Sequence, residues 1–62
     1  MIITTDKSKA IMYLLDGMSV IYHEFRESEK RVVPYELSLN DAIMNVYAIP
    51  EGTRFFIYSN KD

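Results

Sequence analysis

The stretch from Met18 to Leu39 constrains the fold of this chain more than any other part of the sequence. Apolar and polar residues alternate there in two runs, which the charged segment Glu27–Arg31 separates. Alternation with a period of two is typical of β-strands that bury one face. The stretch therefore predicts two strands joined as a β-hairpin.

The length of the hairpin loop decides which side chains face the core. A loop with an odd number of residues places Phe25 opposite Val33. The same loop places Ile21 opposite Leu37. A shift of one residue moves every side chain of a strand to the other face, so the apolar pattern should select the register. We expect the odd loop because it pairs apolar residues with one another.

The alternative is a two- or four-residue loop, which pairs Phe25 with Val32 and Ile21 with Glu36. The loop segment contains no Gly, Asn or Asp, the residues that favour tight hairpin turns. In the expected register His23 lies on the core face opposite Tyr35. We interpret it there as a structural histidine rather than a catalytic or pH-sensing one.

Pro34 restricts the second strand of the hairpin. Proline has no N–H for a ladder hydrogen bond and is found on edge strands or at bulges. We therefore expect the second hairpin strand to lie at an edge of its sheet, or its pairing to break locally.

Two segments carry helix signals. Asp6, or Thr5 before it, can cap a first helix that runs to about Leu15, and Gly17 can end it in the left-handed conformation. Met12 and Tyr13 lie off its expected apolar stripe. That stripe consists of Ala10, Ile11, Leu14 and Leu15.

A second helix is expected to begin at Ser38, with Asp41 as a weak capping-box partner, and to end near Ala48 before Pro50. The segment from Pro50 to Gly52 is expected to form a turn, and Thr53–Ser59 is expected to form the last strand. The helix has apolar residues at helical spacing. They are Leu39, Ala42, Ile43, Val46 and Tyr47.

The fold class is therefore α+β, in one domain that spans residues 1–62, with the element order (β)αββαβ. We expect an antiparallel sheet of three strands with two helices on one face. If the short N-terminal run Met1–Thr5 pairs as a fourth strand, the order is that of a split-βαβ sandwich. In that sandwich the strand of Pro34 would lie in the middle of the sheet, so the strand order stays open.

The small size of the chain limits how it can be stabilised. A chain of 62 residues buries only about 60% of its unfolded surface. It has no cysteine and one histidine, so we expect no disulfide, no metal and no cofactor. Association with a second subunit or a partner is the remaining source of stability.

The charge pattern argues against several function classes. The net charge is −2, with acidic and basic residues interspersed, so no basic stripe marks a nucleic-acid interface. The N-terminus lacks the pattern of a signal peptide, and no apolar run approaches the ~20 residues that span a bilayer. We expect a cytoplasmic domain without a membrane segment.

The sequence predicts no enzyme. With only two glycines, at positions 17 and 52, it has no glycine-rich phosphate loop, and its carboxylates are interspersed with arginines. The expected outer face of the sheet is more informative, because it holds three aromatic residues where such a face is normally polar. We predict that this face binds a partner. The partner-binding residues are Val20, Tyr22, Arg26, Val32, Arg54, Phe56 and Tyr58.

Two functions follow as hypotheses. The first is a non-catalytic protein-interaction module, an inhibitor or adaptor of the kind that phages encode, which binds a partner protein or forms a homodimer through this face. The second is a single-stranded nucleic-acid-binding domain in which the sheet aromatics stack bases. The net charge of −2 and the absence of a matching motif make the second hypothesis weaker.

Overall fold

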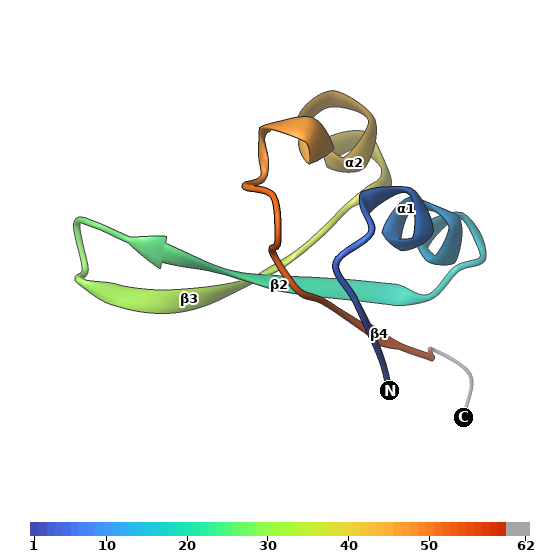
Figure 1. Ribbon diagram of the computed structural model, residues 1–62, viewed down its shortest axis with the longest axis horizontal. Helices are drawn as coiled ribbons and strands as arrows, with labels where there is room; N and C mark the ends of the chain where they lie inside the picture. Colours follow the sequence, from blue (N-terminus) through green and yellow to red (C-terminus); the bar gives the residue numbers. More distant parts are fainter. Residues whose placement is uncertain (60–62) are drawn as a thin grey trace.

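The computed structural model describes residues 1–59, without the side chains of Asp41 and Ile43. Its four strands form one antiparallel sheet in the order β1-β4-β2-β3. They are β1 (Ile2–Thr4), β2 (Ser19–Arg26), β3 (Arg31–Glu36) and β4 (Phe55–Tyr58). Helix α1 (Lys7–Leu15), the short helix α2 (Leu39–Asn45) and the 3-10 turn η1 (Val46–Ala48) lie on one side of the sheet (Figure 1). The α+β class is confirmed.

The N-terminal run does form a strand, and the sheet is not the split-βαβ order expected from four strands. β4 lies between β1 and β2, and β2 lies between β4 and β3. β3 is consequently an edge strand, which confirms the edge position predicted from Pro34. Pro34 faces His23 across the hairpin.

Local signals determine both ends of α1. The Asp6 carboxylate accepts hydrogen bonds from the N–H groups of Ser8 at 2.9 Å and Lys9 at 3.2 Å, which confirms Asp6 as the N-cap. At the other end Gly17 has φ +85°. The Gly17 N–H bonds to Leu14 O at 3.0 Å and the Met18 N–H to Tyr13 O at 3.1 Å, the pattern of a Schellman motif.

The apolar stripe of α1 differs from the expected one at two positions, Tyr13 and Leu15. Ala10 is fully buried, and Tyr13 and Leu14 pack against the core with Ile11. Leu15, expected in the stripe, is 65% exposed. At about 100° per residue, positions three and four after Ala10 flank it, whereas position five lies roughly 140° away. The helix is centred on Ala10, so Tyr13 turns inward and Leu15 outward.

The second helical segment is shorter than predicted. α2 has seven residues and passes directly into η1, so α1 is the one helix of more than two turns in the described chain. Ala42 and Val46 are buried as expected, but Tyr47 is 79% exposed and Leu39 44%. The tighter 3-10 turn rotates Tyr47 away from the sheet and brings Ile49 into the core. The Ile43 side chain, also expected in the stripe, lies outside the described part.

The hairpin register is the alternative one, so the odd loop is wrong. Phe25 pairs with Val32 and Arg26 with Arg31, which leaves a four-residue loop, Glu27–Lys30. The physical reason is Lys30, which adopts φ +52° and closes the loop without Gly or Asn. The Lys30 N–H bonds to Glu27 O at 3.3 Å. Four-residue hairpin loops of this kind are built around a type I turn, which most residues can form.

The corrected register reverses the faces of β2 but leaves those of β3 and β4 as expected. Val20 is fully buried and Tyr22 packs against the core, so both point toward the helices. Ile21, predicted in the core, pairs with Glu36 and points away. The buried core contains residues from every element except β1 and β3. It consists of Ala10, Val20, Leu37, Ala42, Val46, Ile49, Phe55 and Ile57.

Replacing Lys30 with glycine should stabilise the protein by about 0.5–1 kcal/mol, because a non-glycine residue at positive φ is strained and glycine is not. Urea denaturation of both proteins would measure the difference. Ser28→Gly in the same loop is the matched control. Its φ is not positive, so it should be neutral or destabilising. Equal effects of the two changes would contradict the loop geometry.

Candidate functional site

The candidate site is the face of the sheet opposite the helices, called the open face below. Val20, Phe55 and Ile57 are buried toward the helices, so their strand neighbours Ile21 and Phe56 point to the other side. Residues paired across strands share a face, and the observed pairs extend the open face to both edges of the sheet. It comprises Ile3, Ser19, Ile21, His23, Phe25, Val32, Pro34, Glu36, Phe56 and Tyr58.

The open face is largely apolar and uncovered. Phe25 is 56% exposed and pairs with Val32, which is 58% exposed. Ile3 is 51% and Tyr58 43% exposed. An antiparallel sheet face in water normally carries polar side chains. A contiguous apolar face of this size is typical of an interaction surface.

His23 belongs to this surface, which corrects its expected place opposite Tyr35 in the core. It is exposed, pairs with Pro34, and forms a T-shaped contact with the Phe56 ring at a centroid distance of 5.4 Å and an interplanar angle of 83°. Edge-to-face contacts of this kind are favourable between ring systems. His23 therefore bridges the end of β4 and the hairpin.

The structure brings some of the seven predicted partner-binding residues together and separates others. Val32, Phe56 and Tyr58 share the open face. Val20 and Tyr22 lie on the helix side, because the register of β2 is shifted by one residue relative to the expected one. Arg26 also projects to the helix side, and Arg54 is exposed just before β4.

Arg26 is bound within the hairpin. Its Nε donates to the Tyr35 hydroxyl at 3.0 Å, and its guanidinium lies 5.4 Å from the centre of the Tyr35 ring. Its Nη1 also forms an ion pair with Glu29 Oε2 at 3.3 Å. Tyr35 in turn stacks on Tyr22 with ring centroids 5.8 Å apart. The hydrogen bond to Tyr35 is the main cause that raises the pKa of Arg26 above its ordinary value. These contacts stiffen the helix side of a hairpin that projects well beyond the helices (Figure 1).

A groove of about 520 Å³ lies between the hairpin and the segment that leads from η1 to β4. The hairpin contributes Tyr22, Glu24 and Tyr35, and the opposite wall contains Ile49 and Pro50. A second hollow of about 420 Å³ adjoins it. It is lined by His23, Gly52, Thr53, Arg54 and Phe56.

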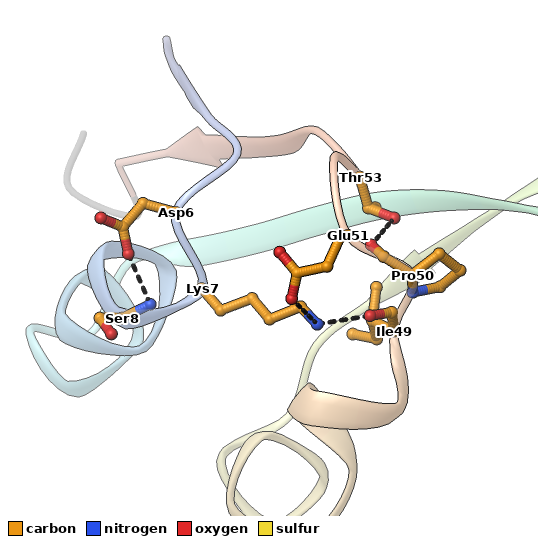
Figure 2. A network of polar contacts seen from close by, with 7 residues as sticks. All are labelled: Asp6, Lys7, Ser8, Ile49, Pro50, Glu51 and Thr53. Atoms are coloured by element: carbon orange, nitrogen blue, oxygen red, sulfur yellow. Dashed lines mark hydrogen bonds and ion pairs between the residues drawn. The ribbon is translucent and has the colours of Figure 1, made fainter.

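Lys7 holds the outer wall of the groove in place (Figure 2). Its side chain is only 10% exposed, and its Nζ donates to the carbonyl oxygen of Ile49 and, at 3.2 Å, to Glu51. The turn that follows is closed by the Thr53 hydroxyl, which donates to Pro50 O at 2.7 Å, and by Gly52 at φ +86°. Lys7 thereby connects the start of α1 to the turn before β4.

Sequence reasoning missed Ile3, Ile21, His23 and Phe25 as members of the open face. Phe25 and Val32 are cross-strand partners only with an even loop, whereas the apolar pattern favours an odd one. It also missed Lys7, because a lysine in the first turn of a helix ordinarily points to water and no local signal marks its contact with Ile49.

No protein-family model, curated protein or solved structure matches the chain. Within residues 1–59, no helix is long and apolar enough to cross a membrane. The same residues contain no cluster of three or more side chains suited to hold a metal ion.

Replacing Lys7 with methionine should destabilise the protein by about 1–2 kcal/mol, because the buried stem is kept but the Ile49 carbonyl loses its donor. Chemical denaturation measures this loss. Glu51→Gln serves as the control, since Glu51 is 91% exposed and a surface ion pair contributes less than about 1 kcal/mol. If the two variants lose equal stability, the ion pair and not the bond to Ile49 holds this wall.

Proposed function

We propose that this chain is a non-catalytic protein-interaction domain that binds a partner protein through its open face. The observation that carries the proposal is the exposure of large apolar side chains on both halves of that face, Ile3 and Tyr58 on one and Phe25 and Val32 on the other. Uncovered apolar surface of this kind is stabilised by burial against another protein.

The size of the face suits a protein partner. The open face extends across all four strands of a molecule that measures 34 × 25 × 20 Å, and a standard interface takes ~800 Å² from each partner. Its residues are also of the appropriate types. Phe25, Phe56 and Tyr58 supply aromatic surface, and Glu36 and His23 supply polar groups among them.

An inhibitor or adaptor is the role we favour for such a domain, with a second copy of the chain as the simplest partner. Nucleic acid is the weaker candidate. Arg26, which was predicted to share the outer face with the aromatics, lies on the opposite side of the sheet and is bound to Tyr35 and Glu29. Glu36 on the open face repels a polyanion, and Arg54 is the one arginine that lines the hollow beside Phe56 within the described chain.

Aspartate at Ile3 or Val32 should weaken association at least about tenfold, because it places a charge in the buried contact. Sedimentation equilibrium at low and high concentration measures self-association. A photo-reactive amino acid at position 32, used in a lysate of the source cells, captures other partners. The matched controls are Met12→Asp and a photo-reactive residue at position 44, since Met12 is 64% and Met44 80% exposed on the helical side.

Self-association that the open-face variants abolish and Met12→Asp preserves supports the proposal. So does a discrete protein captured from position 32 and not from position 44. The proposal would be contradicted if the chain is a monomer at all concentrations and positions 32 and 44 capture the same proteins. Salt-dependent binding of an oligonucleotide by the wild-type chain, lost in Phe56→Ala, would show that the open face binds nucleic acid instead of a protein.

A further inference from the structure

The further inference concerns the edge of β2 that faces β4. The carbonyl oxygen of Val20 accepts a hydrogen bond from the Leu37 N–H at 2.8 Å, so the main-chain groups of Val20 point toward β3. Main-chain groups along a strand alternate between its two sides in steps of one residue. Those of Tyr22 and Glu24 therefore also face β3, whereas those of Ile21, His23 and Phe25 face the β4 side.

β4 covers only part of this edge. It pairs with β2 at Ser19, Val20 and Ile21 and goes no further. The chain before Phe55 turns away through Thr53 and Arg54, which belong to no strand. Within residues 1–59, no strand pairs with His23 or Phe25 on this side. Two N–H groups and two carbonyls, spaced as in a sheet, are thus left facing a gap.

The gap is hollow on both faces of the sheet. The 520 Å³ groove opens on the helix side and the 420 Å³ hollow on the side of Phe56, and His23 and Thr53 line both of them. Room on both sides of a strand edge is what an added strand needs, because its side chains alternate between the two faces. The space beside His23 and Phe25 has this form.

The other two edges of the sheet are poor acceptors. Residues 32, 34 and 36 of β3 direct their main-chain groups away from β2, since the intervening Tyr35 faces Tyr22. The middle one is Pro34, which has no N–H to donate. β1 has only three residues. An additional strand is therefore best accommodated beside β2, in the gap between β2 and the segment before β4.

The residues that line the groove also determine which side chains an added strand should carry. Tyr22, Tyr35 and Ile49 contribute apolar surface to the groove walls, and Glu24 is the charged lining residue whose side chain lies on the helix side. Glu24 is exposed and shares the helix side with Tyr22, so its carboxylate faces the groove. Within the described chain no lysine or arginine lines this groove. A segment that carries Lys or Arg beside apolar residues is complementary to it.

We propose that the gap between β2 and Thr53–Arg54 accepts an extended peptide segment of a partner protein. The segment adds to β2 as a strand, forms main-chain hydrogen bonds with His23 and Phe25, and places a Lys or Arg side chain against Glu24. Strand addition of this type draws its affinity from main-chain bonds and its specificity from alternate side chains. The proposal uses the main-chain groups of His23 and Phe25 and not the open face that their side chains help to form, so it holds whether or not that face binds a partner.

The free protein provides the first test. Hydrogen exchange followed by NMR should show fast exchange at the amides of His23 and Phe25, and slow exchange at those of Tyr22 and Glu24. Protection of all four amides to the same degree would show that the edge is already paired and would overturn the proposal.

The second test selects a display library of random heptapeptides on the immobilised full chain. Enriched peptides should alternate apolar residues with Lys or Arg, and a synthetic copy should slow exchange at the His23 and Phe25 amides. A selection without such enrichment, or a bound peptide that leaves these two amides unprotected, contradicts strand addition here.

Matched substitutions complete the test. Phe25→Pro removes one N–H that faces the gap and no hydrogen bond to β3, and it should weaken peptide binding about tenfold. Phe25→Ala is the matched control, because it removes the same side chain but keeps the N–H, and it should retain more peptide binding than Phe25→Pro. Circular dichroism checks the fold of both. Should Phe25→Pro not fold, Glu24→Lys at the exposed groove wall should give a similar loss, and unchanged binding of this variant refutes the assigned site.

Discussion

The pairing of Val20 with Ile57 at the centre of the sheet is the constraint on which the rest of the structure depends. Both side chains are fully buried against the helices. Because strand residues alternate, this pair places Tyr22 and Glu24 on the helix side and Ile21, His23 and Phe25 on the open side. The open face, the acidic wall of the groove and the direction of the free main-chain groups all follow from the register of this one strand.

The sequence contains enough information for the elements but not for the orientation of β2. In this strand Val20 and Tyr22 on one side are about as apolar as Ile21 and Phe25 on the other, so alternation alone cannot choose. The choice depends on Lys30, whose positive φ completes an even loop without the residues that usually signal one. Residue propensities do not predict this loop, because lysine adopts a positive φ only at a cost in strain.

Signals that act within a few residues were predictable, whereas those that depend on distant contacts were not. Asp6 and Gly17 perform the capping roles expected of them, because both act on neighbouring main-chain groups. The contact of Lys7 depends on how the segment before β4 meets α1, and the exposure of Tyr47 depends on the 3-10 turn that replaces the end of the expected helix. For the site, Val32, Phe56 and Tyr58 could be found from strands whose faces were clear, and Val20 and Tyr22 were misplaced with β2.

Pro34 limits the kind of assembly that this domain can enter. An outer strand with a full set of donors and acceptors can be copied from molecule to molecule, which produces fibres of indefinite length. Here the outer strand β3 lacks a donor at its centre, and the opposite edge has only three residues. Face-to-face contact through a two-fold axis closes on itself, and a strand taken up beside β2 occupies an internal place. Complexes formed in either of these two proposed ways should therefore have a small, fixed stoichiometry.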